Sequence, residues 1–304
     1  MAANPRQYNR HGCIWKAVPS IIVLAILAGI ISLCFSHKHP NTENCTHQLT
    51  ILTYNTLRAG MYKKPPHNDV IHYLQQQDAD IVCLQEVDVY KRNKYLTLPE
   101  FREAMKKYPY SYYDFKIHNG LHQFGIVVFS KYPLTNKNTI QYTSRGNISN
   151  YCDVVVGKDT LRLFNNHLES NNLVAEDLPD SLATESFKNS AHRISDKLGS
   201  ARTLRNEQAR IVREHINQSP YPVIVAGDFN SIPLSYTYLK MRGCDLRDCF
   251  LETSVGRWGA TLNKRHLEIR IDYVLCSKSL HPAATRIDHV RYSDHYPMTA
   301  TIMW

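Results

Sequence analysis

The amino-acid sequence predicts an α/β fold with mixed β-sheets, and three observations support this. Apolar runs rich in Ile, Val, Leu and Tyr have the length and β-branching typical of strands. Helical patterns lie between only some of these runs, so several strands follow one another directly, which favours mixed sheets. No linker divides residues 49–304, so we expect one domain there. The runs cover residues 49–54, 80–84, 124–129, 152–156, 161–164, 222–226, 271–276 and 298–303.

The first 48 residues differ from this domain and are expected to form three segments. Residues 1–16 carry three basic residues and no acid, which favours the cytoplasmic side of a membrane. Residues 17–36 are predicted to be a transmembrane anchor, because an uncharged apolar run of about 20 residues spans a bilayer. The alternative is a cleaved signal peptide, whose apolar core is usually about 7–15 residues. Residues 37–48 would be a linker, and the domain would lie outside the cytoplasm as part of a single-pass membrane protein.

Two helices are predicted within the domain. The stretch "HNDVIHYLQQQ" is short, with Asn68 as a possible cap. A longer helix is predicted over residues 186–217, where apolar residues recur at helical spacing: Ile194, Leu198, Ala201, Leu204, Val212 and Ile216. The same segment also carries six basic residues: Arg193, Lys197, Arg202, Arg205, Arg210 and Arg213. Because Glu207 and Glu214 offset part of this charge, we interpret the basic face as solvated rather than as a polyanion-binding surface.

Charge and cysteines restrict the function only weakly. The formal net charge is +9. Without the first 36 residues the remaining chain has 33 basic and 27 acidic residues, and its net charge is +6. This suits a polyanionic substrate and equally an ordinary solvated surface. Cys83 and Cys276 lie in apolar runs and are expected to be buried, whereas Cys244 and Cys249 are close enough to pair in an oxidising compartment. Cys244 and Cys249 lack partners at zinc-ligand spacing, which argues against a structural zinc site.

Polar residues stand at one end of six apolar segments. In layered α/β folds the strand ends are where sites are built, because the sheet fixes their geometry. Taken singly, most of these residues have an ordinary interpretation as turn caps, surface carboxylates or hydrogen-bonded histidines. Asp272 is different, because an acid beside an apolar run is expected to be buried with a partner. Since six segments share the pattern, we predict that one site contains Asn55, Glu86, His167, Asp228, Asn230, Asp272, Asp294 and His295.

These residue types suit one chemistry. Carboxylates and carboxamides are hard oxygen ligands that bind Mg²⁺, with Mn²⁺ as an alternative. Aspartate can activate water, and histidine can hydrogen-bond a phosphoryl oxygen or stabilise developing charge. The sequence has neither a glycine-rich phosphate loop nor a serine nucleophile elbow. The residues therefore predict metal-assisted hydrolysis of a phosphate ester without a covalent intermediate.

The motifs resemble those of the endonuclease/exonuclease/phosphatase family, which includes DNase I, apurinic endonucleases, neutral sphingomyelinases and inositol polyphosphate phosphatases. The resemblance extends over residues 49–304 and rests on motifs in family order: "TYNTL", "DIVCLQEVD", "GIVVFSKYPL", "NNHLES", "VIVAGDFNSIP", "RIDYVL" and "YSDHYPM". It implies a four-layer α/β sandwich, in which two mixed β-sheets pack face to face with helices outside.

The resemblance also implies roles for the metal-binding and water-activating residues. Glu86 is similar to the main metal ligand of the family, with Asn55 beside it. Asp294 would assist the metal. Asp228 matches the residue that activates water, and Asn230 its companion that holds the phosphate or the nucleophile.

The remaining three residues match groups that act on the phosphate. His167 would contact the phosphate, and His295 would stabilise the pentacovalent phosphorus. Asp272 would orient His295, and this contact should raise the pKa of the histidine.

The resemblance does not settle the substrate. "EIRIDYVL" and "SDHYP" differ from the corresponding inositol phosphatase segments, and Leu57 stands where apurinic endonucleases carry an acid. "HLES" is similar to the "HLQS" of membrane-associated and sphingomyelinase-like members. We therefore expect a monomeric phosphodiesterase that acts on nucleic acid or a phospholipid head group. A non-catalytic module that binds phosphate or nucleic acid on the same scaffold is the alternative.

Overall fold

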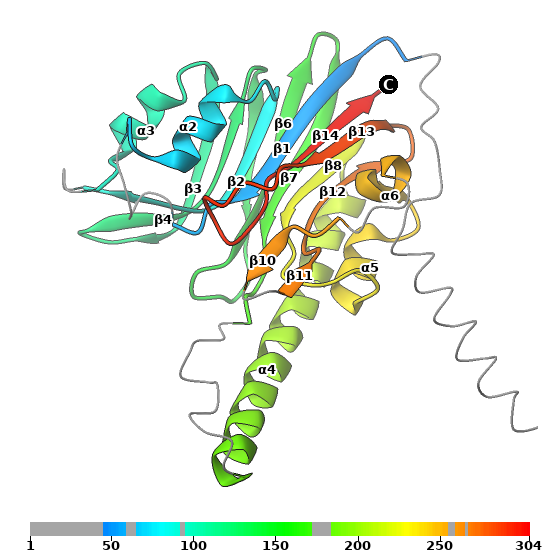
Figure 1. The fold of residues 1–304 in the computed structure, drawn as a ribbon. Coiled ribbons are helices and arrows are strands. Elements are labelled where there is room, and N and C mark those ends of the chain that lie inside the picture. The colour runs from blue at the N-terminus through cyan, green and yellow to red at the C-terminus, as the bar shows by residue number, and fades with distance from the viewer. Residues whose placement is uncertain (1–44, 59–64, 92–94, 172–183, 255–258, 265–266) are drawn as a thin grey trace, which may run out of the picture.

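A computed structural model of the protein describes residues 45–58, 65–91, 95–171, 184–254, 259–264 and 267–304. Two six-stranded β-sheets form the centre of the molecule (Figure 1). The predicted anchor at 17–36 lies outside the described residues. Within them, no helix has the length and apolar character needed to cross a membrane.

The first sheet has the strand order β13-β14-β1-β2-β4-β3. Its central pair, β1 and β2, is parallel, and all its other neighbours are antiparallel, so the sheet is mixed as predicted. The strands are β1 (Gln48–Asn55), β2 (Ile81–Tyr90), β3 (Tyr110–His118), β4 (His122–Ser130), β13 (His281–Ile287) and β14 (Met298–Met303).

The second sheet repeats this plan with the order β5-β6-β7-β8-β12-β9. Here β7 and β8 form the parallel pair, and a long helix connects them. A separate two-stranded hairpin, β10 (Leu262–Lys264) with β11 (Leu267–Ile269), lies nearby. The strands of the second sheet are β5 (Leu134–Ile140), β6 (Ile148–Val156), β7 (Asp159–His167), β8 (Val223–Asp228), β9 (Leu246–Asp248) and β12 (Asp272–Ser277).

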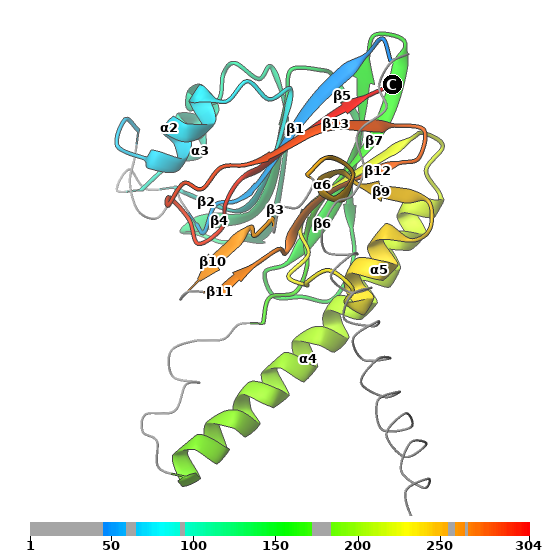
Figure 2. The same ribbon diagram turned by 45° about the vertical axis from the view of Figure 1, so that its right-hand side comes forward.

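The two sheets pack face to face, and helices cover their outer faces. Aliphatic residues and cysteines from both sheets form the buried layer between them. Helices α2 (Asp69–Gln76) and α3 (Leu98–Ala104) pack on the first sheet, and α4 (Thr184–Asn217) and α5 (Tyr236–Arg242) pack on the second. Figure 2 shows these two helical layers on opposite sides of the sheets. The short helix α6 (Cys249–Thr253) packs at the edge of the inter-sheet layer. The predicted pair of mixed, facing sheets is confirmed.

The two predicted helices are present, but the long one is only partly packed. In α2, Asn68 caps the helix by accepting a hydrogen bond of 3.0 Å from the Ile71 amide. In α4, the second half is buried against the second sheet, whereas the first half projects beyond it (Figure 1). Leu198, in the first half, is consequently 37% exposed, although its spacing predicts a buried face. Leu204 is 38% exposed for another reason, because its turn of the helix packs through its neighbours Ala201 and Arg205 instead.

The cysteines differ in part from expectation. Cys83 and Cys276 are buried as predicted. Cys244 and Cys249 are free thiols and do not pair, because Cys249 begins α6 facing the core while Cys244 is exposed. The sulfur of Cys249 lies instead 3.9 Å from that of Cys276.

Candidate active site

The carboxyl ends of the two parallel strand pairs meet at one end of the sandwich. β1 ends in Asn55, which pairs with Gln85 of β2, and Glu86 is the residue after Gln85. β7 and β8 end in His167 and Asp228, which are direct partners across the strands. The Asn55 amide donates hydrogen bonds of 3.1 Å to Glu86 and 3.0 Å to Asp228, so it joins the ends of the two sheets.

Glu86 reaches the site because β2 is irregular at this point. The pairing of β2 with β4 shifts register between Leu84 and Val87, and Glu86 adopts a left-handed backbone with φ of 52°. A bulge of this kind turns a side chain out of the normal alternation of a strand. The Glu86 carboxylate is partly exposed, and one of its oxygens lies 3.5 Å from His167 Nε2.

Asp272, His295 and Asp228 form a buried chain of interacting side chains. β12 runs antiparallel to β8 and places Asp272 directly opposite Asp228. His295 Nδ1 lies 2.9 Å from an Asp272 oxygen and donates to it, while His295 Nε2 lies 3.8 Å from Asp228. The Thr261 hydroxyl accepts a 3.0 Å hydrogen bond from the Asp272 amide, and the Ser293 hydroxyl accepts one of 3.1 Å from the His295 amide. The backbone thus fixes both members of the Asp272–His295 pair.

The surroundings of His295 and Asp228 raise the pKa of both groups, which suits them to acid–base roles. Burial opposes the charge on His295, but the carboxylates of Asp272 and Asp228 outweigh it and raise the pKa of His295 to about 10. Burial, reinforced by the charge of Asp272, raises the pKa of Asp228 to about 6. At neutral pH His295 is therefore a cationic donor, and Asp228 is a carboxylate whose affinity for a proton is higher than usual.

Asn230 and Asp294 complete the group of predicted residues. Asn230 has a left-handed backbone with φ of 49°, and its amide donates a 2.8 Å hydrogen bond to Asp228. Its side chain donates to Asp228 at 3.2 Å and to the Leu168 carbonyl at 2.9 Å. Asp294 lies 3.5 Å from the ammonium group of Lys264. Left-handed non-glycine residues are uncommon and concentrate at functional sites.

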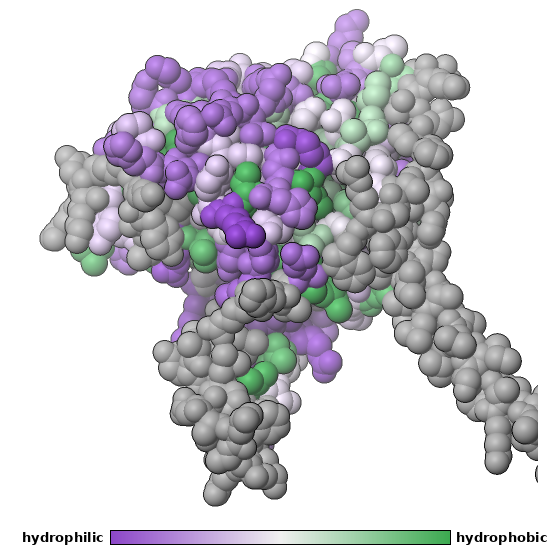
Figure 3. Space-filling view, viewed as in Figure 1, coloured by the Kyte–Doolittle hydropathy of each residue, from purple (hydrophilic) through white to green (hydrophobic). Residues whose placement is uncertain are grey.

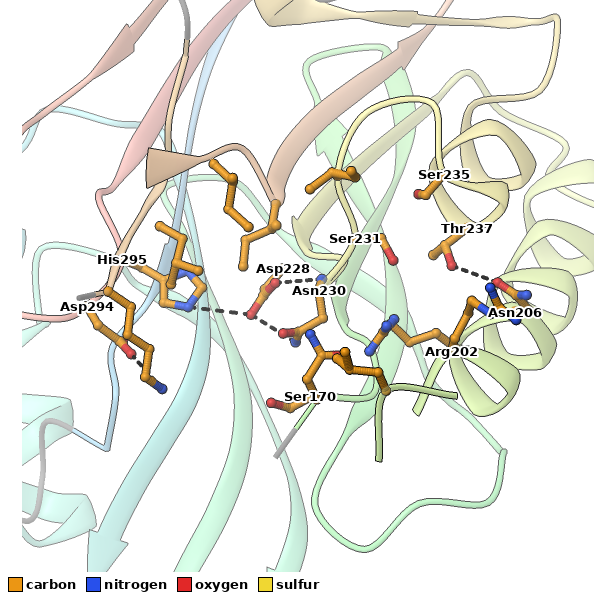
Figure 4. Close-up of a pocket in the computed structure, with 18 of the residues that line it drawn as sticks. Ser170, Arg202, Asn206, Asp228, Asn230, Ser231, Ser235, Thr237, Asp294 and His295 are labelled. Carbon is orange, nitrogen blue, oxygen red and sulfur yellow. Dashed lines mark hydrogen bonds and ion pairs between the residues drawn. The ribbon is translucent and has the colours of Figure 1, made fainter. Parts of the chain in front are cut away.

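These groups surround one end of a cavity of about 620 Å³. Five of the eight predicted residues line it, namely Glu86, Asp228, Asn230, Asp294 and His295. In Figure 4, Asp294 and His295 lie on one side of Asp228 and Asn230, and Arg202 of α4 lies on the other. The other three, Asn55, His167 and Asp272, are buried and contact these lining residues from behind.

Comparison with known proteins decides the family. The sequence pattern of the endonuclease/exonuclease/phosphatase family matches residues 52–295. The chain belongs to this family. No curated protein sequence matches it.

Solved structures agree with this assignment at the level of the fold. The endonuclease/exonuclease/phosphatase from Beutenbergia cavernae is 18% identical with a TM-score of 0.63, over 85% of this chain and 72% of that chain. Truncated Caenorhabditis elegans TDP2 is 19% identical with a TM-score of 0.56, over 84% and 98%. Beta toxin from Staphylococcus aureus is 15% identical with a TM-score of 0.57, over 83% and 99%.

One group of described residues has the spacing of a metal site, because ligand atoms of Asp228, Asp272 and His295 lie within 4.8 Å of one another. A metal bound by all three would have to replace the 2.9 Å hydrogen bond between His295 and Asp272. The carboxylates of Glu86 and Asp294 line the same cavity, and the Asn55 oxygen accepts a hydrogen bond from the Leu57 amide. These three groups are hard oxygen ligands of the kind that binds Mg²⁺ or Mn²⁺.

One cavity residue, Arg205, was not predicted. It is 6% exposed, and its guanidinium donates a 2.7 Å hydrogen bond to the Glu169 carbonyl. Its Nε is buried and has no hydrogen-bond partner among the described residues. The interpretation of the basic face as solvated is wrong for Arg205, although it holds for the exposed Arg210, which pairs with Glu207 and Glu214. The spacing contains the signal, because Arg205 lies four residues from both Ala201 and Ala209 on the buried stripe.

Proposed function

We propose that the protein is a metal-dependent hydrolase of phosphodiesters in which Asp228 activates the attacking water. The observation that supports this best is the chain of Asp272, His295 and Asp228 at the cavity wall. The distance of 3.8 Å between His295 Nε2 and Asp228 is too long for a hydrogen bond. Both groups therefore remain available to a substrate, one as a donor and the other as a base.

In this mechanism each residue has a separate task. Asp228 accepts the proton of the water, and the two hydrogen bonds from Asn230 hold its carboxylate in place. Cationic His295 donates to a phosphoryl oxygen and stabilises its developing negative charge. Asp272 keeps His295 protonated and oriented, while the buried Arg205 adds positive charge. The ring nitrogens of His167, which have no hydrogen-bond partner among the described residues, can hydrogen-bond the phosphate.

The metal would be held by Glu86, with Asn55 and Asp294 beside it. A divalent cation at this position would supply Lewis-acid polarisation of the phosphoryl group and stabilisation of the leaving oxygen.

The proposed substrates belong to one of two classes, nucleic acids or phospholipid head groups. We also propose that the protein is a monomer, that residues 17–36 anchor it in a membrane, and that the domain lies outside the cytoplasm. The uncharged length of that segment and the basic residues before it support this arrangement.

The test is an activity panel with the full-length protein. DNA, RNA, sphingomyelin, inositol phosphates and phosphatidyl lipids are each incubated with Mg²⁺, with Mn²⁺ and with a chelator. The proposal predicts metal-dependent product from at least one of them and a loss of about 10²- to 10⁴-fold in kcat for Asp228→Asn, with binding retained. Tight binding without product, unaffected by Asp228→Asn, would instead support the non-catalytic module.

A further inference from the structure

The catalytic residues occupy only one end of the cavity. Away from Asp228, its walls are formed largely by apolar side chains from three elements. They are Ile194 and Leu198 of α4, Leu262 and Ile269 of the β10–β11 hairpin, and Ile232 and Tyr236, which lie in the turn before α5 and at its first residue. We call this part of the cavity the apolar arm.

Several side chains of the apolar arm are exposed, although apolar residues of this size are normally buried. Leu198 is 37%, Ile232 51% and Tyr236 54% exposed. Figure 3 shows hydrophobic groups interrupting a mainly hydrophilic surface near the centre of the domain and on α4. A cluster of exposed apolar residues continuous with a polar reaction centre is typical of a site for a ligand with an apolar part.

The charge of the cavity favours a substrate with a single phosphate. Its described lining contains four cationic groups, Arg202, Arg205, Lys264 and the protonated His295, and three acidic ones, Glu86, Asp228 and Asp294, so its formal excess is a single positive charge. A nucleic-acid groove needs a series of cations, because each backbone phosphate adds a negative charge. Arg202 forms no hydrogen bond or ion pair with another described residue, and it stands one helical turn from Leu198. It is therefore positioned to meet one anionic group at the junction of the polar and apolar parts.

We infer that this cavity binds an amphiphilic phosphodiester of the phospholipid type. Its phosphate lies between Asp228, His295 and Arg202, and its hydrocarbon lies along the apolar arm. This inference rests on the proposed function and narrows its substrate class. The hydrolysis itself is ordinary: water adds to phosphorus, the ester P–O bond breaks, and the proton of the water is passed to the leaving alcohol.

A homologous series of alkyl p-nitrophenyl phosphates tests the inference. The methyl, butyl, octyl and dodecyl esters share one leaving group and one reaction, and only the hydrocarbon differs. They are assayed with full-length protein below their critical micelle concentrations. Transfer of one methylene group from water into the apolar arm should raise kcat/KM by about three- to fourfold until the arm is filled.

A matched pair of variants identifies where the hydrocarbon lies. Leu198→Gln alters the apolar arm, whereas Leu204→Gln alters the same helix at equal exposure but outside the cavity lining. Leu198→Gln should lower kcat/KM for the dodecyl ester by about tenfold and leave the methyl ester unchanged. Leu204→Gln should change neither ester. The dodecyl ester partitions into any detergent to the same extent in assays of the wild type and of both variants. Partitioning therefore cannot produce a difference between the two variants.

The outcomes separate the inference from the proposed function. If the methyl and dodecyl esters are hydrolysed equally, or if both leucine variants behave alike, the apolar arm does not bind hydrocarbon and only the proposed function stands. Faster cleavage of a single-stranded oligonucleotide than of the dodecyl ester, with no effect of Leu198→Gln, likewise overturns the inference. If no ester, lipid or oligonucleotide is cleaved with either metal, the proposed function itself is wrong.

Discussion

Replacing Asp272 with asparagine removes one negative charge from the interior of the active site and keeps the shape of the side chain. Asp272 is buried, and one of its oxygens accepts the 2.9 Å hydrogen bond from His295 Nδ1. Its other oxygen has no hydrogen-bond partner among the described residues, so the new amide group breaks no second contact. The oxygen of the amide can still accept from His295. The substitution therefore tests the charge of Asp272 more than its geometry.

The expected effect follows from the pKa of His295. This pKa is raised to about 10, because the carboxylates outweigh the opposing effect of burial. Relative to the ordinary value of about 6.5, this corresponds to roughly 5 kcal/mol of stabilisation of the cation. Asp272 alone lies at hydrogen-bond distance, so we assign about half of this to it, which places the pKa of His295 in the variant near 8. At about pH 9 the cationic fraction would then fall from roughly nine tenths to one tenth, an additional loss of about tenfold.

The assay is kcat/KM for one soluble phosphodiester, measured from about pH 5 to about pH 11. The wild-type profile should fall below about pH 6, where Asp228 becomes protonated, and above about pH 10, where His295 loses its proton. In the Asp272→Asn variant the alkaline limb should move to about pH 8. The acid limb should move to a lower pH, because the charge of Asp272 is one of the causes that raise the pKa of Asp228. An equal loss of activity at every pH, with the alkaline limb unmoved, would show that Asp272 does not hold the charge of His295.

Three further substitutions address the metal, the strand geometry and the buried ion pair. Glu86→Gln should raise the Mg²⁺ concentration for half-maximal activity by at least about tenfold, and an unchanged metal titration would contradict its role as a ligand. Gly227→Ala should lower kcat by about 10²-fold and destabilise the fold, because the added Cβ would lie 2.1 Å from the Asn166 carbonyl at a φ of 129°; wild-type kcat and urea unfolding would refute this. Arg270→Met should cost about 3–5 kcal/mol in urea unfolding, because it leaves the buried Asp248, now 2.8 Å from Arg270, without a cation; a cost below about 1 kcal/mol would contradict it.

Most of the strands that the sequence predicted are buried on both faces, although burial alternates along the predicted strand β14. β8, for example, is buried at every position and appears as a continuous apolar run. β3 and β5 were not predicted, and both lie at the edges of their sheets. β5 has the sequence "LTNKNTI", of which only the first and last residues are buried, so no continuous apolar run marks it. Edge strands bury little, and tertiary pairing rather than local pattern determines them.

The same distinction applies to the site. All eight predicted residues lie together because seven of them stand at or beside one end of an apolar strand, and the sheet fixes where those ends lie. The eighth, Glu86, lies within β2. The bulge that turns Glu86 toward the cavity could not be predicted, since it depends on the register between β2 and β4. The apolar arm was also unexpected. Helical spacing predicts that α4 has an apolar face, but it does not show how much of that face the second sheet covers.

The most direct test of the account is the position of a bound divalent cation. Crystals of the protein soaked in Mn²⁺ should give an anomalous peak within about 2.2 Å of a Glu86 oxygen, with Asn55 or Asp294 beside it and the contact between His295 and Asp272 preserved. A peak held instead by Asp272 and His295, or no peak in the cavity at all, would contradict the account.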